Sequence, residues 1–159
     1  MFVNPDNKNE VLAAVKKDGL SLKYVSEKLK DDFDVVLEAV KQSGYAIDYA
    51  SDRLIDDENI VLQAVKQEGG ALNYVSERLK DNEEVVISAI KQDIRSLFFA
   101  SDKLKNNKEF IYSLKDIILE NKNDNSYKQI YQNLLKYERE DELNNIVQDK
   151  PSIYKKNKL

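Results

Sequence analysis

Apolar residues recur with a fixed period along most of the chain. Each copy opens with apolar side chains at positions i, i+1 and i+4, which is the spacing of one face of an amphipathic α-helix. These stripes are Val11, Leu12 and Val15; Val36, Leu37 and Val40; Val61, Leu62 and Val65; and Val86, Ile87 and Ile90. Successive copies are 25 residues apart, as positions 11, 36, 61 and 86 show. The pattern predicts one helix of about three turns in each copy.

A second apolar stripe follows in every copy. Its members are spaced i, i+3 and i+7, which again places them on one helical face. They are Leu22, Val25 and Leu29; Ile47, Ala50 and Leu54; Leu72, Val75 and Leu79; and Leu97, Ala100 and Leu104. Two short helices per copy are therefore predicted. Neither would be stable alone, because isolated helices under about 12–15 residues are marginal in water.

Polar and small residues mark where the helices begin, end and touch. Pairs of residues suited to N-capping precede the later copies. These pairs are Asp31/Asp32, Asp56/Asp57 and Asp81/Asn82. Gly19, Gly44 and Gly69 are predicted to close the first helix of each copy in the left-handed conformation. One repeat position, which we call a column, holds the small residue alanine in every copy, as Ala14, Ala39, Ala64 and Ala89. The small side chain predicts close backbone approach between helices.

A fixed period of this length is typical of a solenoid, in which each unit stacks on its neighbours. We expect an all-α fold, with a short α-solenoid of about four 25-residue two-helix repeats over residues 7–105. The fourth copy departs from the pattern, since Ile94 replaces the glycine. Terminal repeats are expected to be atypical because they cap the stack.

The remaining residues are expected to close one end of the solenoid. Residues 106–148 are predicted to form a degenerate fifth repeat and a C-terminal helical cap, with separate helices around 127–135 and 140–147. A polar connector begins at Asn121, and Ser126 with Gln129 has the spacing of a capping box. Residues 149–159 are predicted to be a flexible basic tail.

Composition excludes several kinds of chemistry. The 159 residues include neither cysteine nor histidine, so a thiolate nucleophile, a Cys-ligated zinc site and a histidine-containing triad are all ruled out. The net charge of −4 argues against nucleic acid as the partner. Residues 1–105 hold 15 basic and 20 acidic side chains, whereas residues 106–159 hold 10 and 9. The start lacks the features of a secretory signal, and no apolar run approaches the roughly 20 residues that a membrane span needs.

A ladder of lysines is the first candidate binding feature. Its members are Lys16, Lys41, Lys66 and Lys91, one per repeat. A row of ammonium groups could bind a phosphate-rich ligand or an acidic protein surface. The favoured alternative is that each lysine complements the negative end of its helix dipole. That alternative also explains the strict period, because every repeat has the same helix end.

Aromatic and hydroxyl columns offer two further candidates. The aromatic column holds Tyr24, Tyr49, Tyr74 and Phe99, and the serine column holds Ser26, Ser51, Ser76 and Ser101. The rings could form a stacking platform, but burial in the core with the hydroxyl at the rim is favoured. Each serine is expected to bond the backbone one turn back or to cap a local break in the second helix.

Acidic residues between the repeats are candidates for metal ligands and for catalytic groups. Carboxylates can bind calcium, but the glycine and the ligand spacing of an EF-hand loop are missing, so helix capping is favoured. A glycosidase-type pair would need two carboxylates that stand apart from the others. No two do, because each recurs in the other copies.

Phe98 is the sharpest single signal. It occupies a column that is polar elsewhere, at Lys23, Asp48 and Asn73. A large apolar residue there could serve as a binding anchor, or it could pack beneath the C-terminal cap.

The repeat resembles a known family of tandem helical repeats. The residues at motif positions are Asp31, Val36, Leu37, Ala39, Val40, Lys41, Gly44, Tyr49, Ala50, Ser51 and Leu54. They are similar to domain-of-unknown-function family 4116, whose members occur in intracellular bacteria and some protists. The resemblance covers about residues 7–105; copy one lacks the preceding acidic pair and copy four lacks the glycine. It implies an all-α repeat fold and transfers no catalytic residues.

The acidic stretch at 136–142, KYEREDE, carries a second resemblance. It is similar to the glutamate-rich stretch near the C-terminus of type IV effectors of Legionella-like intracellular bacteria. That resemblance implies translocation into a host cell by a type IV system, as an alternative to a cytoplasmic location in the producing cell.

The sequence favours a non-enzymatic module that binds another protein, as a translocated effector or as a regulator or inhibitor of another effector enzyme. The expected partner-binding residues are Phe98, Lys91, Lys66, Lys41 and Lys16. No catalytic, metal-binding or cofactor-binding residue is expected. A self-associating structural oligomer and a carboxylate-based hydrolase or transferase remain as alternatives, and the oligomeric state and the partner's identity stay open.

Overall fold

The computed structural model describes residues 4–120 and 128–148, which are helical apart from short turns and caps. The chain forms two compact units, Met1–Lys105 and Asn106–Leu159. The all-α repeat fold expected from the sequence is confirmed. The connector after Asn121, the capping box at Ser126 and the basic tail at 149–159 lie outside the described residues.

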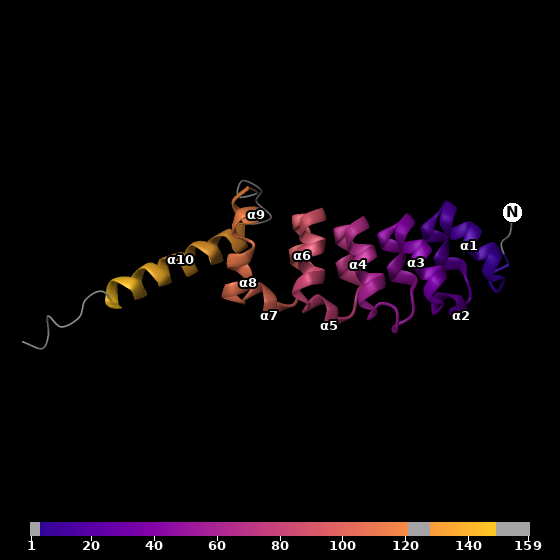
Figure 1. Ribbon diagram of the computed structural model, residues 1–159, viewed down its shortest axis with the longest axis horizontal. Helices are drawn as coiled ribbons and strands as arrows, with labels where there is room; N and C mark the ends of the chain where they lie inside the picture. The colour runs from indigo at the N-terminus through magenta and orange to yellow at the C-terminus, as the bar shows by residue number, and fades with distance from the viewer. Residues whose placement is uncertain (1–3, 121–127, 149–159) are drawn as a thin grey trace, which may run out of the picture. The chain divides into compact units, whose positions relative to one another are not determined.

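Four α-helices of ten residues form one layer of the first unit. They are α1 (Lys8–Lys17), α3 (Phe33–Gln42), α4 (Glu58–Gln67) and α6 (Glu83–Gln92). Their N-caps are Asn7, Asp32, Asp57 and Asn82, and each side chain accepts hydrogen bonds from backbone N–H groups of the first turn. The four helices stand side by side (Figure 1), and neighbouring helices contact one another. The predicted first helix of each repeat is therefore confirmed.

The second layer differs from the prediction. Its main elements are 3₁₀ helices, namely η1 (Gly19–Tyr24), η2 (Gly44–Tyr49), η3 (Gly69–Tyr74) and η4 (Ile94–Phe99). A single α-helical turn follows in three copies, as α2 (Glu27–Lys30), α5 (Glu77–Lys80) and α7 (Asp102–Lys105). In copy two, residues 52–56 form a turn instead. The predicted continuous second helix is wrong, since it is divided in two at the serine.

Hydrogen bonds between repeats explain that break. The backbone N–H of Ser51 donates to the carbonyl of Lys30 at 3.0 Å, and Ser76 donates to Ile55 at the same distance. A serine N–H that binds the preceding repeat cannot also continue a helix of its own. The serine hydroxyl then caps the next turn, because Leu79 N–H donates to Ser76 Oγ at 3.3 Å. The local-break alternative is therefore confirmed for Ser51, Ser76 and Ser101, whereas the side chain of Ser26 makes no capping hydrogen bond.

Both apolar stripes face the space between the two layers. The α-helices bury Val36, Val40 and their equivalents, while the second layer buries Leu72, Leu79 and theirs. The middle residue of each first stripe, such as Leu37, is half-buried rather than in the core. Ala50 of the second stripe is half-buried as well, and the other stripe residues lie in the core as predicted.

The repeat glycines hold the layers close together. Each glycine begins a 3₁₀ helix, and none has the positive φ that a left-handed cap requires, so that prediction is wrong. The residues that end the α-helices, such as Ser43, are extended. A Cβ on Gly44 would come closer than 3.0 Å to the backbone carbonyl oxygen of Ala64. Gly19 meets Ala39 and Gly69 meets Ala89 in the same way. The close approach predicted from the alanine column is therefore confirmed. The glycine of one copy is the residue that lies against the alanine of the next copy.

The second unit has three described helices. They are α8 (Lys108–Ser113), α9 (Lys115–Glu120) and α10 (Lys128–Gln148). Asn107 caps α8 as its counterparts cap the earlier copies. The predicted pair of helices around 127–135 and 140–147 is wrong, because one helix runs through the described residues from 128 to 148. Phe110, Ile111 and Leu134 lie in the core of this unit. That the unit caps the repeats stays a prediction.

Candidate functional site

Exposed apolar side chains gather on the 3₁₀ helices. Eight large apolar side chains are exposed among the described residues, and six of them lie on η1 to η4. The six, which we call the aromatic surface, are Leu20, Tyr24, Tyr45, Tyr74, Phe98 and Phe99. The other two are Phe33 on α3 and Leu143 on α10. The expected burial of the aromatic column is therefore wrong, as Tyr24 shows with 76% of its side chain exposed.

The 3₁₀ geometry accounts for this exposure. A 3₁₀ helix has three residues per turn, so a side chain two positions after a buried one points away from it. Leu72 is fully buried in η3, and Tyr74 follows it by two positions. The same relation holds between Leu22 and Tyr24 in η1. Anchoring the leucine in the core therefore turns the ring outward.

One part of the aromatic surface is hollowed. A groove of about 510 Å³ is walled by the rings of Tyr45, Tyr74, Phe98 and Phe99. Tyr45 and Tyr74 pack edge to face, with ring centroids 6.3 Å apart and planes at 89°. Gly70 lies in the groove as well, and a Cβ there would come within 2.6 Å of the Tyr45 hydroxyl. We call this feature the aromatic groove.

A small set of polar groups accompanies the rings. Asp93 and Arg95 line the groove and form an ion pair, with Arg95 Nη2 donating to Asp93 Oδ2 at 2.7 Å. The hydrogen bonds from Arg95 hold the pKa of the Asp93 carboxyl below its usual value. Asn73 is exposed beside them, and Ser96 is 1% exposed. The groove therefore combines four rings with one amide and one mutually paired acid and base.

The structure separates the residues predicted to bind a partner. Phe98 is 48% exposed and lines the aromatic groove, with its neighbour Phe99. The four lysines are exposed in the last turns of α1, α3, α4 and α6. Lys66 and Lys91 line a different hollow, of about 370 Å³. Phe98 and the lysine ladder thus belong to two surfaces, and a binding role for either stays a prediction.

The ladder lysines differ in their partners. Lys41 Nζ lies 2.8 Å from Glu38 Oε1, and Lys16 Nζ lies 3.9 Å from Glu38 Oε2. Gln63 and Ser88 take the place of Glu38 in the next two copies. Glu38 therefore balances the charges of Lys16 and Lys41, and the equivalent positions in the next two copies carry no carboxylate for Lys66 and Lys91.

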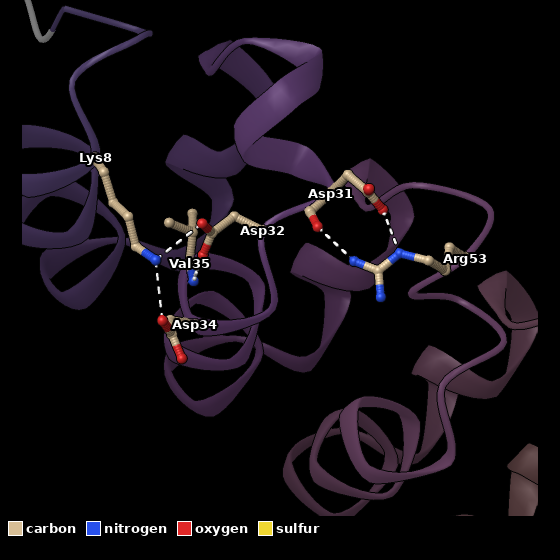
Figure 2. A network of polar contacts seen from close by, with 6 residues as sticks. All are labelled: Lys8, Asp31, Asp32, Asp34, Val35 and Arg53. Atoms are coloured by element: carbon tan, nitrogen blue, oxygen red, sulfur yellow. Dashed lines mark hydrogen bonds and ion pairs between the residues drawn. The ribbon is translucent and has the colours of Figure 1, made fainter.

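A polar clasp between successive repeats was missed in the sequence. The Asp31 carboxylate accepts hydrogen bonds from Ser51 Oγ and, at 2.9 Å, from Arg53 Nε. Figure 2 shows the contact between Asp31 and Arg53. Arg53 Nη2 also donates to the Asp31 carbonyl at 2.6 Å. The clasp recurs 25 residues on, as Asp56 with Ser76 and Arg78, and again as Asp81 with Ser101 and Lys103. In each case the serine follows the aspartate by 20 residues and the basic residue follows it by 22. These constant offsets are the signal in the sequence that could have revealed the clasp.

The two residues of each acidic pair therefore have different tasks. Asp32 caps α3 and also contacts Lys8 at 2.9 Å, whereas Asp31 forms the clasp (Figure 2). Copy one has the counterparts Asp6 and Asn7, so it does not lack the pair entirely, and Asn7 is its cap. The prediction that both members of each pair are caps is wrong.

Comparison with protein-family models identifies the repeats. The model described as "Domain of unknown function (DUF4116)" matches residues 7–55, 57–105 and 82–136. The chain belongs to this family. The third match reaches beyond residue 105, so the DUF4116 pattern extends into the second unit, which the sequence analysis had placed outside it. No curated protein and no solved structure matches the chain.

The clasp carboxyls of this DUF4116 chain are expected to make its stability depend on pH. Hydrogen bonds from Ser76 and then Arg78 lower the pKa of Asp56, and the pKa of Asp31 falls for the same reasons. For Asp81 the hydrogen bond from Lys103 is the larger cause. A carboxyl with a lowered folded-state pKa stabilises the fold above its unfolded value of about 3.9, and this contribution is lost as pH falls through the folded value.

We therefore expect the midpoint of urea unfolding to stay constant from about pH 7 to pH 5 and to fall below about pH 4. The Asp56→Asn variant should be less stable than the natural chain at neutral pH. Its stability should also fall less on acidification, because the amide cannot take up the proton that the Asp56 carboxylate binds on unfolding. Urea titrations of both proteins across this range provide the measurement. An identical acid response in the two proteins would contradict the role of Asp56.

In the second unit, the acidic stretch of the DUF4116 chain packs against α8 and α9. Tyr112 Oη donates to Asp141 Oδ2 at 2.7 Å, and Lys108 Nζ contacts the other oxygen of Asp141 at 2.5 Å. Glu138 pairs with Lys115 at 2.6 Å. Burial and the bond to Asp141 raise the pKa of Tyr112 to about 12. Two acidic residues of the stretch thus connect α10 to α8 and α9.

Within residues 4–120 and 128–148, no group of three or more acidic side chains is placed to hold a metal ion. The helices of that part of the chain also include none long and apolar enough to cross a membrane.

Proposed function

We propose that this DUF4116 chain is a non-enzymatic module that binds another protein through its aromatic surface. The observation that supports the proposal is the concentration of six of the eight exposed large apolar side chains on η1 to η4. Contiguous exposed apolar patches are costly in water and commonly mark interaction sites. Aromatic residues around a groove are also typical of the side chains that dominate binding energy. The aromatic groove is the expected centre of the interface.

Catalysis is the weaker proposal. A general acid or base is usually a group in a cleft whose pKa is moved toward neutrality. The carboxyl pKa values that shift here, such as those of Asp56 and Asp93, are lowered by ion pairs and hydrogen bonds. Asp93 is held by Arg95 within the aromatic groove itself. These features support a binding role over a carboxylate-based hydrolase or transferase.

The same surface suits an effector or a regulator of another effector enzyme, since both act by occupying a partner. The competing role is self-association, in which the aromatic surface of one copy would contact a second copy. Light scattering of the purified chain separates these two: a monomer favours a partner of different sequence, and a stable dimer favours self-association.

Affinity capture from bacterial and eukaryotic lysates tests the proposal directly. A partner retained by the natural chain should be lost when Tyr45 and Phe98 are both replaced by alanine. The matched control is Phe33→Ala, which removes an exposed ring from α3, outside the aromatic surface. A Lys91→Glu variant tests the lysine ladder in the same assay. The proposal fails if the double variant keeps every partner, or if Phe33→Ala loses them equally.

The Tyr45 and Phe98 variants also report on structure. Both side chains are more than 40% exposed, so truncating them should cost less than about 1 kcal/mol of unfolding free energy. A large loss of stability would show that the rings hold the fold and would remove the reason to assign them to a partner.

A further inference from the structure

Between the first and second repeats, a lysine ammonium of the protein lies against two aromatic rings. Lys23 Nζ lies 5.9 Å from the ring centroid of Tyr24 and 5.8 Å from that of Tyr49. An ammonium within about 6 Å of an aromatic face is attracted by the ring quadrupole. Two successive rings of the aromatic column therefore make a cation site, and the protein fills it with its own lysine.

The repeat period locates the equivalent position two copies later. Adding 50 residues to Lys23, Tyr24 and Tyr49 gives Asn73, Tyr74 and Phe99. These last three residues all line the aromatic groove. Asparagine is shorter than lysine and uncharged, so it supplies no cation to the rings. The groove thus has the rings of the Lys23 site without its ammonium.

Two further sequence differences distinguish the groove from the Lys23 site. Gly70 stands in the column of Leu20, Tyr45 and Arg95, so the third copy adds no side chain of its own there, and the Tyr45 hydroxyl lies beside the glycine instead. Phe98 replaces the polar residues of its column and adds a further ring. Tyr45 supplies a fourth aromatic wall. An aromatic-lined groove of this kind is the arrangement that proteins use to recognise ammonium and guanidinium groups.

We infer that the aromatic groove takes a lysine or arginine side chain from a basic segment of the partner protein. The inference rests on the proposed function, and it names the chemistry of the partner at that surface. Charge supports it, because residues 1–105 hold 15 basic and 20 acidic side chains. A partner of opposite sign is favoured by the negative net charge of this segment as a whole.

Replacing Arg95 distinguishes a cationic partner from an anionic one. Its guanidinium lies at the groove and is paired with Asp93. An incoming cation is repelled by Arg95 and attracted by Asp93, so the two groups largely cancel. Arg95→Gln removes the repulsion and frees the carboxylate. This variant is therefore expected to bind a cationic partner more tightly, whereas it would weaken binding of an anionic one.

The test uses the full chain and a short fluorescein-labelled Gly/Ser peptide that carries arginine. Identical peptides with norleucine or glutamate at the same positions are the comparison ligands. Fluorescence anisotropy should show about tenfold tighter binding of the arginine peptide than of either comparison peptide. Asn73→Lys, which restores the lysine of copy one, should weaken arginine-peptide binding about tenfold by filling the groove from within. Arg95→Gln should strengthen it.

Lys23→Asn is the reverse of Asn73→Lys, because it removes a lysine from the equivalent site. It is expected to create binding, and a gain of binding cannot result from misfolding. It removes the ammonium between Tyr24 and Tyr49, so a second binding event for the arginine peptide is expected. Equal binding of the norleucine peptide would overturn the inference in favour of an apolar occupant. Preference for the glutamate peptide, or an unchanged affinity in Asn73→Lys, would overturn it as well. If the arginine peptide fails while the double alanine variant still loses its lysate partner, the cation inference fails and the proposed function stands.

Discussion

Replacing Gly44 with alanine is expected to lower the free energy of unfolding by about 2–3 kcal/mol. A Cβ at this position would meet the backbone oxygen and carbonyl carbon of Ala64, and also the Cβ of Glu68. These atoms belong to α4 of the next copy and to its C-cap residue, so they cannot move aside without shifting a helix. Overpacking against backbone is costly because close-packed interiors have little spare volume. The effect should appear as a lower urea midpoint measured by circular dichroism.

Gly70→Ala is the matched control. The three atoms nearest to its added Cβ all belong to the Tyr45 side chain, which lies on the surface and can rotate away. The expected cost is within about 0.5 kcal/mol. If Gly44→Ala and Gly70→Ala were equally well tolerated, the contact between Gly44 and Ala64 would not hold the repeats together. A smaller aromatic groove in Gly70→Ala should still weaken partner binding.

The α-helical layer could be predicted because its signal is local. Val36 and Val40 lie one turn apart, and a buried helical face needs apolar residues at that spacing whatever packs against it. Asp32 and Asn82 cap the helices that follow them for the same reason. These features depend on residues within a few positions of one another, which a single sequence displays directly.

The second layer could not be predicted in the same way. The spacing of Leu22 and Val25 suits a turn of three residues as well as one of 3.6, so it does not separate a 3₁₀ from an α-helix. The break before α2 depends on the hydrogen bond from Ser26 N–H to Pro5 O, whose partners are far apart in the chain. The outward direction of Tyr24 follows from that geometry. Its exposure therefore could not be read from a column of tyrosines.

The candidate site was found only in part for related reasons. Phe98 stood out because it broke the polarity of its column, and it does line the aromatic groove. Gly70 was overlooked beside Gly69, although its own column holds Leu20, Tyr45 and Arg95. The lysines were named as partner-binding residues because they recur at a fixed place in each repeat. The two layers present different surfaces, and the repeat period carries no information about which surface a column occupies.

The second large effect is expected at Leu72, whose replacement by alanine should cost about 3–4 kcal/mol of unfolding free energy. Leu72 is fully buried in η3, between the layers. Truncation removes apolar surface from the core and leaves a cavity that a short 3₁₀ helix can only partly close. Urea unfolding provides the measurement. Leu20→Ala is the control, because Leu20 is 44% exposed on η1 and should cost within about 0.5 kcal/mol.

Leu72 also links the fold to the proposed site. The same 3₁₀ helix that buries Leu72 carries Asn73 and Tyr74 at the aromatic groove. A 3₁₀ helix has weaker internal hydrogen bonds than an α-helix, so its orientation depends on the side chain that anchors it. Leu72→Ala should therefore weaken arginine-peptide binding even under conditions in which the variant is fully folded. Unchanged binding in the folded variant would show that Tyr74 and Phe99 keep their positions without Leu72, and that the groove does not depend on this anchor.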